Sequence, residues 1–204
     1  MHFKQMKRVG LTLAVFVVVG CGSGEPSEAD KQEVVDQYAV VVFESYKESL
    51  ETATQLDTKI RDFTAAPDST KFQAAKDAWL VARNPYGQTE GYRFYGGPID
   101  NEEDGPEGLI NAWPLDENYI DYTRDANGAG LVNGTAPLTK ELLVAQNEKD
   151  GEKNISTGYH AIEFLLWGQD AIDPANELPG QRPHTDYLDM ASGGTAPNAD
   201  RRSQ

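Results

Sequence analysis

The sequence predicts an all-α protein, a helical bundle with long connecting loops. Apolar residues recur at steps of three and four in several segments, which is the period of an amphipathic helix. Glycine- and proline-rich stretches separate these segments, and no run shows the sustained alternation of apolar and polar residues that marks a strand. With 204 residues, 39% of them hydrophobic, the chain is large enough to bury a core.

The first 20 residues form a segment of their own. Basic residues precede an apolar run over 11–19, which is too short to span a bilayer but matches the core of a signal peptide. Gly20 and Cys21, the single cysteine, follow in a pattern that resembles a bacterial lipobox. We therefore predict a lipoprotein signal peptide over 1–20, a membrane anchor on lipidated Cys21 and a tether over 21–29. An ordinary signal peptide with an incidental cysteine, or a weak membrane anchor, is the alternative.

Two longer helices open the predicted helical domain. A continuous apolar stripe over 35–63 indicates one long helix, and Pro67 ends it. A second helix is predicted over 69–82. Pro85 is expected to interrupt or kink it, although helical structure could continue as far as Phe94.

Shorter helices separated by loops fill the rest of the domain, which we place at 30–204. Ser156 or Thr157 can cap one of these helices, and Gly168 can end it. Asn198 is expected to cap a last turn. The loops are predicted at 95–114, at 127–137 and over most of the chain after 168, and the helices at 115–122, 138–146 and 158–167.

A histidine and a glutamate are the strongest candidates for chemistry. His160 and Glu163 lie three residues apart on a predicted helix, so both side chains project from one face. An imidazole and a carboxylate so placed can share a metal ion, and nitrogen with oxygen ligands suits iron, zinc, copper or manganese. The alternative is a structural histidine bonded to a neighbour. Further ligands would come from acids elsewhere, among them Glu90 and Asp100.

Several other functions are disfavoured by the sequence. A net charge of −15 repels nucleic acid phosphates, so no nucleic acid partner is expected. A single cysteine excludes a zinc finger or an iron–sulfur site. The chain has no His-Glu-x-x-His, no Gly-x-Ser-x-Gly and no phosphate-binding loop. A Ser-His-Asp triad stays open, although nothing local points to one.

Several blocks of sequence resemble one known family. Residues 158–163, Gly-Tyr-His-Ala-Ile-Glu, resemble the Gly-x-His-x-x-Glu signature of the imelysin family, and the likeness continues through 170. Further blocks that resemble the iron-regulated branch lie at 84–100, 105–122, 179–183 and 198–202. Members of this family continue beyond the block at 198–202 into further helices. The resemblance therefore implies that the chain is truncated at its C-terminal side and forms the first half of a two-bundle fold.

The resemblance also implies ligands and a location. Imelysin-like proteins are exported to the cell envelope, often as lipoproteins, and many are linked to iron uptake. The signature implies that His160 and Glu163 hold metal together with upstream acids. By position Glu90 is the best match for such an acid, and Asp100 is a weaker one. Residues Arg83 and Tyr86 are implied as partners that orient the ligands, with helix packing as their alternative role.

Three functions remain as hypotheses. The first is a metal-binding lipoprotein of the cell envelope, facing the periplasm or the cell surface. It would bind a divalent or ferric ion, iron above zinc or copper, and act with envelope iron-uptake components. The second is a metal-dependent peptidase with Glu163 as general base. It is weaker because no second histidine is in range. The third is an adaptor lipoprotein that binds no metal.

Overall fold

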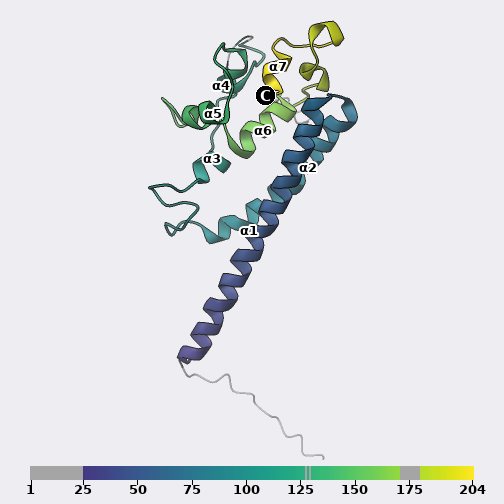
Figure 1. Cartoon of the computed structure of the whole chain (residues 1–204). Helices are drawn as coiled ribbons and strands as arrows, with labels where there is room; N and C mark the ends of the chain where they lie inside the picture. The colour runs from purple at the N-terminus through teal and green to yellow at the C-terminus, as the bar shows by residue number, and fades with distance from the viewer. Residues whose placement is uncertain (1–24, 127, 129, 171–179) are drawn as a thin grey trace, which may run out of the picture. The chain divides into compact units, whose positions relative to one another are not determined.

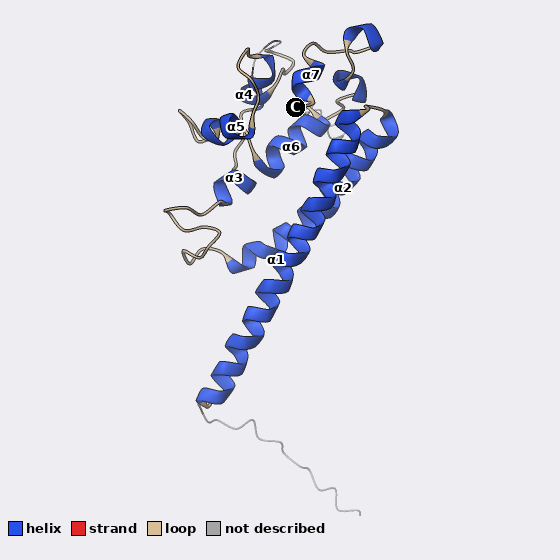
Figure 2. Cartoon of the chain, viewed as in Figure 1, coloured by secondary structure: helices blue, strands red, loops and turns tan. Residues whose placement is uncertain are grey.

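The structure, a computed structural model, describes residues 25–126, 128, 130–170 and 180–204 (Figure 1). The predicted signal peptide and the predicted lipidation site Cys21 lie outside these residues. Contacts divide the chain into two units, Met1–Gln37 and Tyr38–Gln204. In the described ranges the secondary structure consists of helices, with no strand (Figure 2). The all-α prediction is therefore confirmed.

The first helix, α1, extends over Glu28–Ala65. Within the first unit, Ser27 and Asp30 cap its start. The Asp30 amide donates to Ser27 Oγ at 3.2 Å, and the Ser27 amide donates to Asp30 Oδ2 at 2.9 Å. This reciprocal pairing is a capping box. In the second unit the helix runs on to Ala65, two residues before Pro67. The predicted long helix is confirmed, and it begins inside the stretch 21–29 that was predicted as a tether.

The second helix, α2 (Ser69–Thr89), passes through its proline. Asp68 caps the start, where the Lys71 amide donates to Asp68 Oδ1 at 2.8 Å. Pro85 is buried inside the helix and does not interrupt it. The chain stays helical beyond it and continues into a 3-10 turn, η1 (Glu90–Tyr92). Of the two outcomes expected at this proline, continuation of the helix is the one observed.

Short helices make up the remainder of the second unit. The predictions for 115–122, 138–146 and 158–167 are confirmed, the last of them to the residue. With 3-10 helices marked η, the elements are α3 (Glu107–Asn111), α4 (Glu117–Ile120), η2 (Leu131–Asn133), α5 (Lys140–Gln146), α6 (Gly158–Trp167), η3 (His184–Tyr187), η4 (Met190–Ser192) and α7 (Ala199–Arg202).

One α-helix and three 3-10 helices lie in segments predicted as loops, and two expected caps behave differently. The segment 95–114 was predicted as a loop, but it contains α3 with Pro106 at its N-cap. Thr157 and Asn198 stand at the N-caps of α6 and α7 without a side-chain capping bond. Their side chains contact other segments instead: Thr157 Oγ1 donates to the Leu109 carbonyl at 2.9 Å, and Asn198 Nδ2 donates to Asn133 Oδ1 at 2.8 Å.

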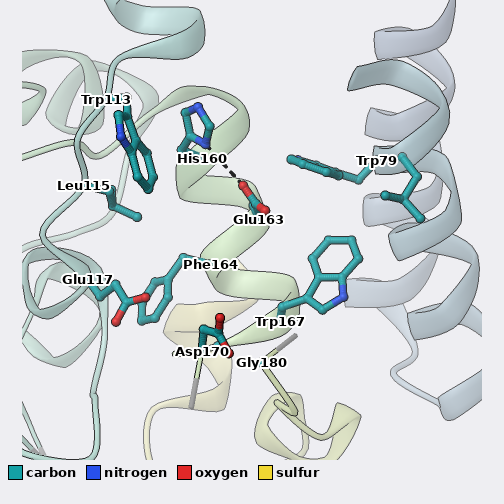
Figure 3. Close-up of a pocket in the computed structure, with 12 residues that line it drawn as sticks. Trp79, Trp113, Leu115, Glu117, His160, Glu163, Phe164, Trp167, Asp170 and Gly180 are labelled. Atoms are coloured by element: carbon teal, nitrogen blue, oxygen red, sulfur yellow. Dashed lines mark hydrogen bonds and ion pairs between the residues drawn. The ribbon is translucent and has the colours of Figure 1, made fainter. Parts of the chain in front are cut away.

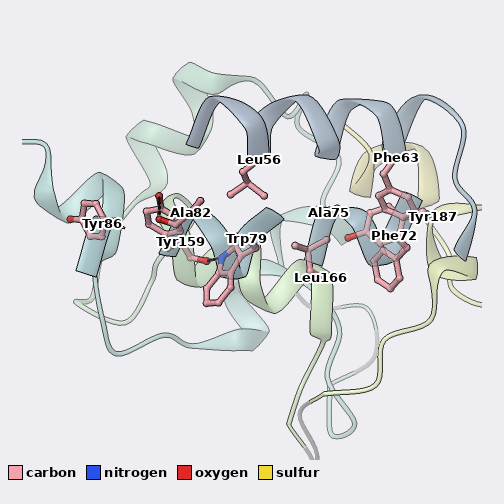
Figure 4. Packing of buried hydrophobic residues seen from close by; sticks show 10 residues of the cluster. All are labelled: Leu56, Phe63, Phe72, Ala75, Trp79, Ala82, Tyr86, Tyr159, Leu166 and Tyr187. Carbon is pink, nitrogen blue, oxygen red and sulfur yellow. Dashed lines mark hydrogen bonds between the residues drawn. The ribbon is translucent and has the colours of Figure 1, made fainter. Parts of the chain in front are cut away.

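The core joins the second unit's part of α1 to α2 and α6 (Figure 4). Phe63 packs on Phe72 and Tyr187 with ring centroids 4.9 and 4.8 Å apart. Trp79 Nε1 donates to the Tyr159 carbonyl at 3.0 Å, which ties α2 to α6. The buried members of this cluster are Leu56, Phe63, Phe72, Ala75, Trp79, Ala82, Tyr86, Tyr159, Leu166 and Tyr187.

The opposite side of α6 packs on a second, smaller cluster around α4. Its buried members are Ile120, Ala161 and Phe164. Because α6 packs against a cluster on each of two sides, the orientation of the side chains between these two buried faces is fixed. Among the described residues, no helix has the length and apolar character needed to cross a membrane.

Candidate functional site

The site begins with the glycine that opens α6. Gly158 has a φ of +84°, a conformation that favours glycine. A Cβ atom at this position would lie 2.4 Å from the Ile110 carbonyl oxygen, so the backbone of α6 approaches α3 too closely for any side chain. At the other end Gly168, with φ +71°, ends the helix through a bond from its amide to the Phe164 carbonyl at 2.7 Å. The two glycines therefore fix the length and position of α6.

His160 and Glu163 lie together on one side of this helix (Figure 3). His160 Nδ1 is 3.2 Å from Glu163 Oε2. The histidine side chain is 17% exposed and the glutamate 43%. Trp113 covers the imidazole, with ring centroids 4.8 Å apart. The predicted pair is thus held as a pair, and both side chains can reach solvent.

A pocket of about 510 Å³ opens beside this pair (Figure 3). Three tryptophan rings and one phenylalanine ring contribute to its wall, and three acidic side chains lie around it. The lining consists of Trp79, Leu80, Trp113, Leu115, Glu117, His160, Glu163, Phe164, Trp167, Gly168, Asp170 and Gly180.

Two acids in this pocket were not identified as site residues from the sequence. Glu117 opens α4, and Asp170 follows the end of α6. Burial is the main cause that raises the pKa of Glu117, and Asp170 raises it further, whereas a hydrogen bond from Gln169 opposes the shift. Each acid lies singly in a loop or a short helix, so no spacing pattern marked it. The structure brings both acids into the wall of the pocket that holds the histidine.

The two upstream acids proposed as ligands do not line this pocket. Glu90 is exposed at the start of η1. Asp100 is half-buried and accepts hydrogen bonds from the amides of Phe94 and Gly97, the second at 3.0 Å. In the part of the chain that the structure describes, no three His, Cys, Asp or Glu side chains are grouped closely enough to hold a metal ion. The ligand roles of all four predicted residues stay predictions.

Tyr86 lies in the core, and the half-buried Arg83 lies beside it, next to the first turn of α6. The Arg83 guanidinium is 5.6 Å from the ring centroids of Tyr86 and Tyr159. Tyr86 is buried, and burial raises the pKa of its phenol to about 12. The contacts that the structure gives them are packing contacts with the residue next to His160. Their predicted orienting role stays a prediction.

A second cluster of charges lies wholly inside the protein. Asp121 is fully buried and receives Arg182 Nη1 at 2.7 Å and Arg202 Nε at 2.7 Å. Arg202 adds a second bond from Nη2 at 3.1 Å, which makes its contact with the carboxylate bidentate. Arg182 also reaches Asp186 at 3.4 Å, and Tyr122 donates to the same carboxylate. The cluster ties together the loop after α4, η3 and α7.

The electrostatics of Asp121 follow from these contacts. Burial alone would raise the pKa of its carboxyl group, but the hydrogen bond from Arg202 and the charges of both arginines outweigh burial and hold the pKa below its ordinary value. Sequence reasoning did not single out this network, because its members are separated by 61 and 81 positions.

Comparisons with known proteins place the chain in a family. The sequence model of the imelysin family, designated Peptidase_M75, matches residues 42–201. Iron-regulated protein A of Synechococcus elongatus is similar to this chain, with 34% identity over 136 residues. That alignment covers 67% of this chain and 30% of the relative, so the chain spans about a third of the relative's length. Because the family model matches more than half of the chain, α6 with His160 and Glu163 included, the chain belongs to the imelysin family.

Proposed function

We propose that the chain is part of a cell-envelope lipoprotein that binds a metal ion and serves iron acquisition. The observation that carries this proposal is the meeting of His160 Nδ1 and Glu163 Oε2, 3.2 Å apart, at the wall of an acidic pocket. Iron is the expected metal because the similar cyanobacterial protein is named for its regulation by iron. Zinc and copper are the alternatives that the same donors allow.

The residues fit a metal ion in part. A neutral imidazole nitrogen and a carboxylate oxygen are good ligands for first-row transition metals. The surrounding Glu117 and Asp170 add negative charge, which favours a cation in the pocket. Only two protein donors converge in the described residues, so water or another small ligand would complete the coordination. This donor set suits a site that accepts and releases its ion rather than a closed structural site.

Glu163 can support binding in two ways. It can give a carboxylate oxygen to the ion beside the histidine. It can also accept the Nδ1–H of His160, which fixes the ring and leaves Nε2 as the donor to the metal. Glu163→Gln separates these roles, because a glutamine oxygen still accepts the hydrogen bond but carries no charge.

Metal titration of the purified full chain tests the proposal. We expect binding of one Fe(II), Cu(II) or Zn(II) ion per chain, weakened roughly 10- to 100-fold in His160→Ala. His184→Ala is the matched control, because this histidine lies in η3 and outside the pocket lining, and its loss should leave the affinity unchanged. Stoichiometric binding that survives His160→Ala would contradict the assignment of the site.

Attachment to the envelope rests on Cys21. The sequence around it resembles a lipobox, and its lipidation would anchor the chain in a membrane and place the domain in the periplasm or at the cell surface. Labelling of the expressed protein with a radioactive fatty acid tests this: the label should be lost in Cys21→Ser. Equal labelling of the variant would contradict lipidation at this residue.

A peptidase is the second candidate, favoured by the designation of the matching family as Peptidase_M75. Glu163 is 43% exposed and could serve as a general base toward a metal-bound water. Cleavage of an unfolded protein substrate that is sensitive to a chelator and lost in Glu163→Ala would favour it over simple binding. Absence of any metal above background in the purified and the reconstituted protein would instead favour an adaptor.

A further inference from the structure

All three tryptophans of the protein line the same pocket. The chain has three tryptophans, and Trp79, Trp113 and Trp167 all line the pocket beside His160 (Figure 3). Trp79 and Trp167 meet edge to face with centroids 5.3 Å apart. Trp79 is part of the core, but Trp113 is 67% exposed, an unusual position for so large an apolar ring. An exposed tryptophan at the edge of a pocket is available to contact a ligand.

The size of the pocket exceeds what a hydrated metal ion requires. An ion with six waters occupies roughly 180 Å³ at about 30 Å³ per water. The pocket of about 510 Å³ instead lies in the range of about 300–1,000 Å³ that small organic ligands occupy. Its aromatic walls give a hydrated ion little stabilisation, whereas a flat organic group can stack on them. The part of the pocket that a bound ion would not fill is therefore suited to an organic ligand.

The charge of the pocket selects among organic ligands. Glu117, Glu163 and Asp170 line it, and no lysine or arginine is among the described lining residues. Two cations contact rings of its wall from outside the lining: Lys76 Nζ lies 5.3 Å from the Trp167 ring centroid, and the Arg182 guanidinium lies 5.4 Å from that of Phe164. Arg182 is already paired with Asp121. Such a pocket repels anionic chelates and accepts neutral or cationic ones, which tryptophan faces also favour.

We propose that the pocket binds its metal as a neutral or cationic chelate with a flat aromatic body. His160 and Glu163 would hold the metal, the chelator would fill the coordination positions that the protein leaves open, and Trp113 with Trp167 would stack on its rings. This inference rests on the proposed metal-binding function. To that function it adds the chemical class of the metal complex that the pocket binds.

The test compares two copper complexes on the full chain. The 1:1 complexes of Cu(II) with 1,10-phenanthroline and with ethylenediamine are both dications with the same number of occupied positions, but only the first is aromatic. Quenching of tryptophan fluorescence reports binding, because all three fluorophores line this pocket. We expect the phenanthroline complex to bind at least about tenfold more tightly than the ethylenediamine complex. Such a factor is expected when stacking on two tryptophan rings contributes to the binding free energy.

Variants of the wall separate its contributions. Trp113→Ala should remove most of the preference for the aromatic complex, and Phe94→Ala, which removes an exposed ring outside this pocket, should leave it intact. His160→Ala should weaken both complexes alike. Glu117→Gln should weaken both dications about threefold or more, since a carboxylate facing the pocket is neutralised.

The outcomes distinguish this inference from the function on which it rests. Equal affinity for the two complexes, both dependent on His160, would overturn the aromatic chelate and leave metal binding in place. Metal-free phenanthroline that binds as tightly as its complex, with no effect of His160→Ala, would overturn both. A preference for the aromatic complex that persists in Trp113→Ala and in Trp167→Ala would also overturn the inference.

Discussion

Two regions of this protein pair a carboxylate with a nitrogen-bearing side chain, and they differ in burial and in the number of partners. At Asp121 the carboxylate is fully buried and two arginines satisfy both of its oxygens. At Glu163 the carboxylate is 43% exposed and has a single histidine nitrogen as its described partner. The first arrangement is saturated, whereas the second leaves donor capacity unused at the edge of a pocket.

The difference separates a structural from a functional use of charge. A buried carboxylate is costly unless its partners replace its hydration completely, and once they do so no position is left for a ligand. A partly exposed pair gains less stability, because water competes for its carboxylate. Its geometry is free to serve binding. The pocket pair can therefore change without loss of the fold, and the buried cluster cannot.

Removal of the buried carboxylate should have the largest effect on stability. We expect Asp121→Ala to lower the free energy of unfolding by about 3–5 kcal/mol, because two buried guanidinium groups lose their counter-charge. Urea denaturation followed by circular dichroism measures this. Arg61→Ala, which breaks an exposed pair on α1, is the control and should leave the midpoint unchanged. A midpoint for Asp121→Ala equal to that of the wild type would show that the network is dispensable.

A methyl group at the start of α6 should have the next largest effect. Gly158→Ala adds a Cβ in a left-handed conformation and against the Ile110 carbonyl. Backbone strain of this kind costs about 1–3 kcal/mol. Gly91→Ala is the matched control, because a Cβ there meets nothing within 4 Å. Unfolding midpoints that fall equally in the two variants would refute the close approach of α6 to α3.

Acid should weaken the buried cluster in a defined direction. Because the folded pKa of Asp121 is lowered, its contribution to stability is complete above the ordinary aspartate pKa of about 4 and is lost as the pH falls through the folded value. Asp121→Asn has no group that titrates there. The stability difference between wild type and this variant should therefore shrink below about pH 4, as measured by urea midpoints at successive pH values. A constant difference would argue against the lowered pKa.

Removal of the histidine of the pocket pair should have the smallest effect on stability and the largest effect on metal affinity. His160→Ala breaks the contact with Glu163 on the same helix and the ring contact with the largely exposed Trp113, each worth roughly 0.5 kcal/mol at a partly exposed position. Its unfolding curve should nearly overlay that of the wild type, while metal affinity falls. A large loss of stability would instead mean that the histidine belongs to the core, and the contrast between the two regions would disappear.

The helices that begin or end at recognisable cap residues were predictable from the sequence. The bounds of α6 follow from Gly158 and Gly168, and the stripe in α1 follows from its period. The helix α3 was missed because Gly105, Pro106 and Gly108 resemble loop residues. In the structure, however, the proline stands at the N-cap, and the glycines lie beside other chain segments.

The pocket was only half predictable. His160 and Glu163 share a helix, so their spacing reveals their proximity. Glu117 and Asp170 reach the same pocket from other segments, and only tertiary packing places them there. Local periodicity carries no information about such long-range neighbours. For the same reason the partners of Asp121 could not be paired from the sequence.

The separation of these partners along the chain also orders events during synthesis. Arg182 and Arg202 follow Asp121 by 61 and 81 residues, so a nascent chain that has reached residue 180 holds the carboxylate without either of them. Gly180, which completes the wall of the pocket, emerges at the same late stage. The ribosome must therefore release almost the whole described chain before the domain can close. A chain that has not yet reached Arg202 lacks the bidentate partner of Asp121, so the buried cluster can form only after that residue has emerged.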